Sequence, residues 1–214
     1  MSEAVKKSFL QKFTVSDLLI IVAMATLGIV LKPIIVPIAH LVSGPLLIPG
    51  GALAGGLYML WLVVGFGLVG KRGTATLIGL IQALVIMFTG VIGSHGIMTL
   101  ASYVAPGLVM DLVLLVLGHR VCCRQCAVVA GLSANLTGTF VVNFIFFNLP
   151  GFFLVLMLCV AALSGAVGGL LAWELLRLLD KYHLRPQQRH KKKIPPEGFT
   201  QEGQFIDQKS EAVE

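Results

Sequence analysis

The chain has 214 residues, of which 57% are hydrophobic and 12% are charged, and its formal net charge is +6. Soluble domains carry about twice that charged fraction, so the composition argues against a soluble globular protein. The apolar runs are continuous rather than alternating, which also argues against a β-barrel. The composition therefore indicates an all-α membrane protein.

Apolar runs of membrane-spanning length follow one another with short connections. We expect a six-transmembrane-helix bundle with spans at 18–41, 46–69, 73–92, 98–118, 126–148 and 151–178. The predicted organisation has three parts: a cytoplasmic N-terminal segment at 1–17, a membrane domain at 18–179 and a disordered cytoplasmic tail at 180–214. The basic start resembles a signal peptide, but no small-residue cleavage site follows it, so we interpret 18–41 as a retained helix.

Lysine and arginine alternate between the two sides of the predicted bundle. The first segment, the second and fourth turns and the tail contain Lys6, Lys7, Lys12, Lys71, Arg72, Arg120, Arg124, Lys181, Arg185, Arg189, Lys191, Lys192, Lys193 and Lys209. The other three turns contain none. By the positive-inside rule, this pattern places both termini in the cytoplasm.

The first span carries a charge at membrane depth, in the stretch "LGIVLKPIIVPIAHLVSG". Lys32 is followed by Pro33 and Pro37, each of which lacks a backbone donor and disrupts a helix. Irregular backbone in a membrane is tolerated where it is buried or lines a wet cavity. We therefore expect a cavity on the extracellular side. Lys32 is then hydrated, paired with Asp111 or directed at an anionic ligand group; a lysine that snorkels outward is the alternative.

Polar residues at four-residue spacing form stripes on two predicted helices: Asn135, Thr139 and Asn143, and Tyr103, Gly107 and Asp111. Such groups are costly in lipid and face the bundle interior or a cavity. They either bridge neighbouring helices or converge on a polar chamber. The candidate substrate-binding residues are Lys32, His40, Ser43, His95, Tyr103, Asn143, Asn148 and Asp111.

Small residues at four-residue spacing mark the expected helix contacts. The main examples are Ala161, Gly165 and Gly169 in the last span and "PGGALAGG" at the start of the second. In the first span, Ala23, Ala25 and Gly28 form a looser patch that could dock a second membrane protein.

The sequence contains no catalytic constellation, so we do not expect an enzyme. It has no Walker A motif, no GxSxG motif and no carboxylate pair at helical spacing. The cysteines of "CCRQC" at 122–126 lie in a cytoplasmic turn and are either incidental thiols or a weak metal signal. We predict no cofactor and no bound metal.

The proline-interrupted first span, the glycine-rich entry to the second and the stretch "VGKRGTATLIGLIQALVIMFTG" resemble the S components of energy-coupling factor (ECF) vitamin transporters. The resemblance is nearest to the thiamine and pyrimidine-precursor group and covers about residues 15–180. Many S components carry a strict AxxxA on the first span, which the patch at Ala23, Ala25 and Gly28 only approximates.

The resemblance implies a plasma-membrane protein that captures a micronutrient at an extracellular-side pocket. It further implies that a coupling membrane subunit and two ATPase subunits drive uptake. The expected partners are thus a small-molecule substrate, these subunits and membrane lipids, with no nucleic acid. The alternatives are an autonomous small-molecule transporter or channel, or a membrane-embedded assembly factor.

Overall fold

The computed structural model describes residues 13–44, 50–90, 96–118, 121, 123–148 and 150–182. The regular secondary structure of this part of the chain is entirely helical. In chain order the elements are α1 (Val15–Val30), α2 (Lys32–Ser43), α3 (Gly50–Val69), α4 (Thr74–Thr89), α5 (Met98–Val116), α6 (Arg124–Val142), the π-helical turn η3 (Asn143–Phe147) and α7 (Gly151–Lys181).

Five segments are long and apolar enough to cross a membrane: α1 with α2, α3, α5, α6 with η3, and α7. The chain is therefore a multi-pass membrane protein, and the expected all-helical class is confirmed. The third expected span, 73–92, is shorter than predicted, because α4 has only 16 residues. At 1.5 Å per residue it measures about 24 Å, which is less than the ~30 Å hydrocarbon core of a bilayer.

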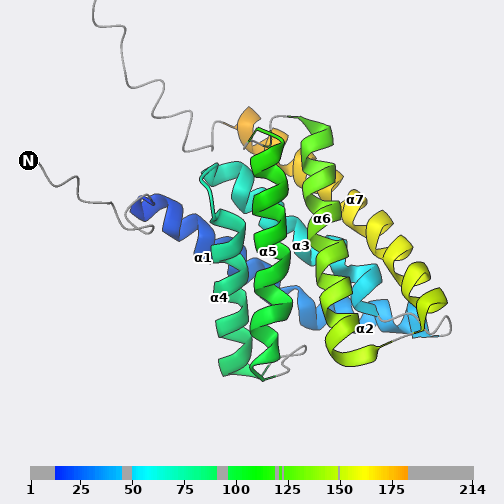
Figure 1. The fold of residues 1–214 in the computed structure, drawn as a ribbon. Coiled ribbons are helices and arrows are strands. Elements are labelled where there is room, and N and C mark those ends of the chain that lie inside the picture. The colour runs from blue at the N-terminus through cyan, green and yellow to red at the C-terminus, as the bar shows by residue number, and fades with distance from the viewer. Residues whose placement is uncertain are drawn as a thin grey trace, which may run out of the picture.

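The helix α3 lies at the centre of the bundle, where it contacts α1, α2, α4, α6 and α7. Figure 1 shows α4, α5 and α6 side by side, with α1 and α2 running obliquely to them. The extensive contacts of α7 with α3 and α6 complete the bundle. Because α3 is buried on nearly all sides, its residues are apolar around the whole helix rather than on one face.

The first span is much more regular than the sequence predicts. Only Leu31 separates α1 from α2, and its backbone is itself close to helical, with φ −74° and ψ −24°. Pro33 stands in the first turn of α2, where a missing N–H costs no hydrogen bond, and Pro37 is accommodated inside the helix. The expectation that Pro33 and Pro37 disrupt the helix in this span is therefore wrong.

Glycines allow the central helices to approach closely. A side chain at Gly168 would strike the carbonyl group of Gly56, and one at Gly165 would strike the backbone of Gly131. The Ser164 hydroxyl adds a polar link to this contact, since it accepts a hydrogen bond from the Gly56 N–H at 3.0 Å. The small residues of the predicted spans therefore serve packing within the bundle.

The small patch on the first span is also used inside the bundle. Ala25 is fully buried, and Gly28 lies against the side chain of Gln82 in α4. Only Ala23 is exposed among the three. The expectation that Ala25 and Gly28 offer a docking face to a second protein is therefore wrong.

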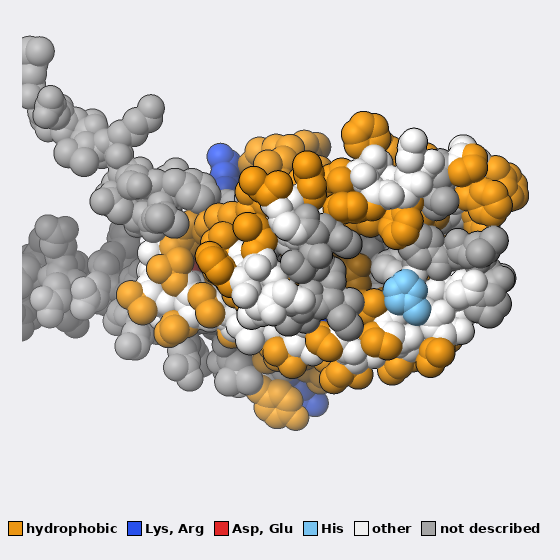
Figure 2. Space-filling model, turned by 90° about the horizontal axis from the view of Figure 1, so that it is seen from below, with side chains coloured by type: hydrophobic (Ala, Val, Ile, Leu, Met, Phe, Trp, Pro, Cys, Tyr) orange, Lys and Arg blue, Asp and Glu red, His pale blue; other side chains and the backbone are white. Residues whose placement is uncertain are grey.

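The two ends of the bundle differ in charge. Four basic residues lie at the end of the bundle where α3 and α7 finish: Lys71, Arg72, Arg124 and Lys181. The opposite end, where α4 and η3 finish, is seen in Figure 2, and hydrophobic side chains surround much of its edge. This asymmetry agrees with the predicted orientation, in which the basic end faces the cytoplasm.

Candidate functional site

Lys32 is the most unusual side chain in the membrane part of the structure. It is 9% exposed, and its ammonium group donates a hydrogen bond to the hydroxyl of Tyr103. The same nitrogen lies 3.9 Å from the ring centroid of Tyr103 and 4.4 Å from that of Tyr58. Lys32 is thus held between two aromatic rings, an arrangement that attracts a cation through the ring quadrupoles.

The charge of Lys32 has no carboxylate within ion-pair distance among the described residues. Carboxylates elsewhere in this part of the chain pair with other cations, Asp17 with Lys71 and Glu174 with Arg177. A lysine ammonium has three donors, whereas Tyr103 accepts only one of them. Since an unpaired buried charge is costly, the site is suited to a group that brings negative charge or further acceptors.

A small cavity of about 50 Å³ lies next to this cluster, between α3, α6 and α7. Its walls are formed by Gly51, Ala52, Tyr58, Gly138, Thr139, Val142 and Met157. Tyr58 connects the two features, because its ring faces the Lys32 ammonium and its hydroxyl donates to the Gly51 carbonyl at 3.1 Å. The cavity is large enough for a few water-sized groups.

The other expected outer residues occupy different environments. Ser43 is buried, and its hydroxyl has no hydrogen-bond partner among the described residues. His40 is exposed, and its ring lies beside Gly50 at the start of α3. Asn143 is buried, whereas Asn148 is exposed and adopts a left-handed conformation with φ 44°. His95 lies outside the described residues.

Asp111 does not lie beside Lys32. Its carboxylate accepts hydrogen bonds from the Thr76 N–H at 2.8 Å, the Thr76 hydroxyl at 2.6 Å and the Ala75 N–H at 3.3 Å. Asp111 follows Tyr103 by eight residues on α5, which places it about 12 Å further along the helix. The alternative in which Lys32 pairs with Asp111 is therefore wrong, because Asp111 caps the N-terminus of α4 instead.

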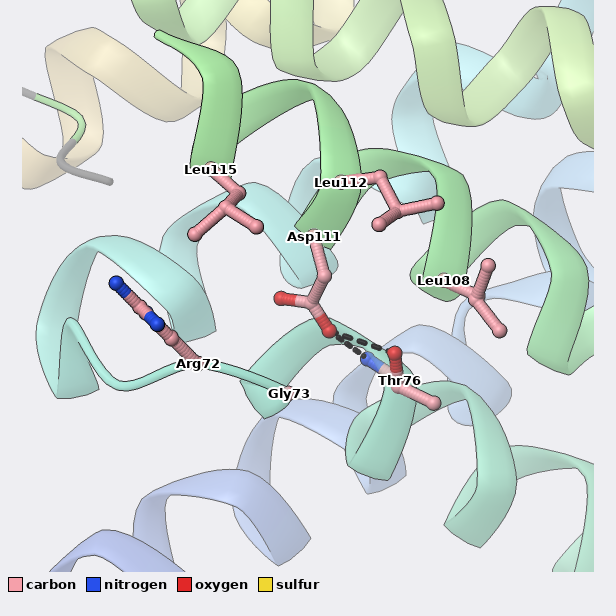
Figure 3. A pocket seen from close by; sticks show the side chains of 7 residues that line it. All are labelled: Arg72, Gly73, Thr76, Leu108, Asp111, Leu112 and Leu115. Atoms are coloured by element: carbon pink, nitrogen blue, oxygen red, sulfur yellow. Dashed lines mark hydrogen bonds between the residues drawn. The ribbon is translucent and has the colours of Figure 1, made fainter. Parts of the chain in front are cut away.

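Asp111 and Thr76 line a surface pocket of about 210 Å³ at the basic end of the bundle. Figure 3 shows Asp111 directed from α5 at Thr76, with Leu108, Leu112 and Leu115 on the same helix. The carboxylate already occupies the α4 terminus, where an anion would otherwise bind. The N–H groups at this terminus are therefore already used within the fold.

The polar stripe on α6 divides into two roles. The Asn135 amide donates to the carbonyl groups of Ala52 at 3.3 Å and Ala161 at 2.7 Å, so it ties α6 to α3 and α7. A side chain at Gly55 would overlap this amide. Thr139, one turn further, lines the cavity instead. The helix-bridging interpretation thus holds for Asn135.

Tyr58 is the site residue that sequence reasoning missed. The chain has only three tyrosines, and this one lies in the apolar stretch "GGLYMLW" of α3. Tyrosines in membrane helices are enriched near the two interfaces. The position of Tyr58 well inside a span could therefore have marked it as a candidate site residue. The π-helical turn at Asn143–Phe147 was also missed, because single π turns have no clear sequence signature.

The fold is similar to that of a solved structure described as "Crystal structure of an S-component of ECF transporter". The match has a TM-score of 0.68 at 18% sequence identity, and it covers 86% of this chain and 99% of that chain. No curated protein matches the sequence. The structural match establishes the fold, and it agrees with the resemblance seen in the sequence.

Residues 16–137 match a protein family described as "ABC-type cobalt transport system, permease component". The family and the structural match both indicate a transport protein of the plasma membrane. Because the family match covers more than half of the sequence, the chain belongs to the family of permease components of ABC-type cobalt transport systems.

Proposed function

We propose that the chain is the substrate-binding subunit of an ECF-type importer. In this proposal, the half of the bundle around Lys32 faces outward and captures a small micronutrient, a vitamin or a vitamin precursor, that carries an anionic group. The fold similarity to an S component supports the general role. The specific proposal depends on the position of Lys32.

The observation that carries the proposal is a nearly buried ammonium group beside a cavity. Lys32 contacts two tyrosine rings and one hydroxyl, and no carboxylate of the described chain neutralises it. Charged groups inside membrane helices usually mark substrate paths because they are costly to keep there. An anionic ligand would recover part of that cost and use the remaining donors of Lys32.

The proposal assigns ATP hydrolysis to partner subunits. The sequence carries no Walker A motif, so a coupling membrane subunit and two ATPases would supply the driving force. The chain would then act by binding rather than by catalysis. In this arrangement both termini and the basic end of the bundle lie in the cytoplasm, and the cavity beside Tyr58 opens on the opposite side.

Cobalt is the second candidate substrate, because the family description names it. The described residues contain no group of three or more His, Cys, Asp or Glu side chains placed to hold a metal ion. The ammonium of Lys32 would also repel a divalent cation in the cavity. These observations favour an anionic organic substrate over a metal ion at this site.

Binding measurements on the purified full chain test the proposal. Native mass spectrometry identifies any retained ligand, and titrations then compare nicotinate, biotin and thiamine phosphate with thiamine and Co²⁺. We expect at least one of the anionic probes to bind. The substitution Lys32→Met should then raise its Kd about tenfold or more, since a hydrogen bond to a charged group contributes about 1.5–3 kcal/mol.

Lys181→Met is the matched control, because Lys181 is exposed at the far end of α7. It should leave the Kd unchanged. Binding of Co²⁺ alone, or an unchanged Kd in Lys32→Met, would refute the anionic site. Co-purification of tagged protein from its native host tests the partners separately. Failure to recover a coupling subunit and ATPases would refute the importer assembly without affecting the binding result.

A further inference from the structure

Two cysteines at the start of α6 bring their sulfur atoms into contact. The Sγ atoms of Cys123 and Cys126 are 3.0 Å apart. Cys123 is the N-cap residue of α6, with an extended backbone, and Cys126 lies in the first turn of the helix. Both residues are half-buried. The sequence "CRQC" therefore forms a dithiol at a helix N-terminus rather than two unrelated thiols.

The dithiol needs little movement to form a covalent bond. A disulfide has an S–S distance of about 2.05 Å, so the sulfurs must approach by about 1 Å. Cys123 precedes the helix, and rotation of its side chain leaves the hydrogen bonds within α6 in place. The neighbouring Ala127 is fully buried and packs against Gly169 of α7, which holds the first turn of the helix in position.

The surroundings also favour the reactive form of Cys123. The Cys126 N–H points at the Cys123 sulfur at a distance of 3.4 Å. The positive end of the α6 dipole lies at the same terminus, and the helix begins with the basic residue Arg124. These features stabilise negative charge on the sulfur, and the thiolate is the nucleophile in thiol–disulfide exchange.

We propose that Cys123 and Cys126 form a redox-active pair that closes to an intrachain disulfide by exchange with a low-molecular-weight disulfide such as glutathione disulfide. The Cys123 thiolate attacks one sulfur of glutathione disulfide and displaces one glutathione thiolate. The Cys126 thiolate then attacks the Cys123 sulfur of the mixed disulfide and displaces the second. The two cysteines lose two electrons and two protons, and the two released thiols gain them.

The pair responds to the redox state of the compartment that it faces. It lies at the basic end of the bundle, which the charge asymmetry assigns to the cytoplasm. Thiols there are held reduced, so the dithiol is the resting form and the disulfide forms when the glutathione pool is oxidised. This property depends on the α6 terminus alone, and not on which substrate binds near Lys32.

Redox titration of the full-length protein in nanodiscs tests the proposal. The protein is equilibrated with glutathione and glutathione disulfide at a series of ratios, quenched with acid, alkylated and digested. We expect Cys123 and Cys126 to lose two hydrogen atoms in total and to escape alkylation together, with a single midpoint. Tandem mass spectrometry should locate the bond between these two residues.

Three serine variants make the result specific. Cys122→Ser should keep the same midpoint, whereas Cys123→Ser and Cys126→Ser should each abolish the intrachain bond. Serine also caps helices well, so α6 is retained in Cys123→Ser. A bond that joins Cys122, stable mixed disulfides with glutathione in the unmodified protein, or full alkylation at every ratio would each overturn the proposal.

Discussion

Lys32 at the start of α2 donates a hydrogen bond to the hydroxyl of Tyr103 in α5, although 71 positions separate them in the chain. Tyr58 of α3 completes the cluster, with its ring centroid 4.4 Å from the same nitrogen. Three helices that are distant in sequence thus meet at one charge. The cluster is both a structural link and the centre of the proposed binding site, and the two roles can be measured separately.

A double-mutant cycle measures the structural link. Lys32→Met and Tyr103→Phe each remove one partner of the hydrogen bond and keep most of the side-chain volume. Because the bond involves a charged donor, we expect a coupling of about 1.5–3 kcal/mol in the free energy of unfolding. Chemical denaturation of the two single variants and the double variant in detergent gives this value.

Tyr58→Phe is the matched control for that cycle. The Tyr58 hydroxyl donates to the Gly51 carbonyl and not to Lys32, and its ring remains in the variant. Its coupling to Lys32→Met should stay below about 0.5 kcal/mol, as for groups without a shared bond. Equal coupling for the two tyrosines would contradict the assigned hydrogen bond.

Substitution of Gly168 tests the contact between α3 and α7. A methyl group at Gly168 would strike the Gly56 carbonyl, so Gly168→Ala must push the two helices apart. We expect a loss of about 1–3 kcal/mol in the free energy of unfolding, the usual cost of overpacking. Gly151→Ala is the control, because nothing lies within 4 Å of the added methyl group. Similar losses in both variants would argue against the close approach.

The spans and their packing faces were predictable because lipid imposes simple requirements on the sequence. Each span must be apolar and long enough to cross, and small residues mark the positions where backbones meet. Gly165 and Gly169 were recognised for this reason and do lie in helix contacts. The meeting of Lys32 and Tyr103 followed from their similar depth along the predicted spans.

The partner of each polar group could not be predicted, since it depends on helix rotation and on which helices are neighbours. The sequence offered Asp111 as a counter-ion for Lys32, but Asp111 faces the terminus of α4. The spacing likewise predicted that Asn135 and Thr139 form one stripe, but of these two residues only Thr139 lines the cavity. Prolines were also misleading, because Pro33 lies in a first turn, where it is compatible with a helix.

The ion pair of Asp17 with Lys71 should contribute to stability. The two groups are 2.5 Å apart, and Asp17 also accepts hydrogen bonds from the backbone and the hydroxyl of Thr14. Asp17→Ala removes all of these bonds, and we expect a loss of about 2–4 kcal/mol in the free energy of unfolding. Lys71→Met removes one bond from a partly exposed partner and should cost about 1 kcal/mol or less.

Glu174→Gln is the control for a surface ion pair. Glu174 and Arg177 are both exposed, with their closest atoms 4.0 Å apart, so the change should be within about 0.5 kcal/mol. Thermal unfolding in one detergent ranks the stability of the unmodified protein and of the three variants Asp17→Ala, Lys71→Met and Glu174→Gln. If Glu174→Gln were as damaging as Asp17→Ala, the capping arrangement of Thr14 and Asp17 would not explain the loss.

Asp111→Ala separates helix capping from ligand binding. The variant leaves the first N–H groups of α4 without their acceptor, so we expect a loss of about 1–2 kcal/mol in the free energy of unfolding. The Kd for an anionic probe should not change, because Asp111 lies about 12 Å along α5 from Tyr103. Lys32→Met should show the reverse, with a raised Kd. A Kd that rises as much in Asp111→Ala as in Lys32→Met would return Asp111 to the binding site that the sequence predicts.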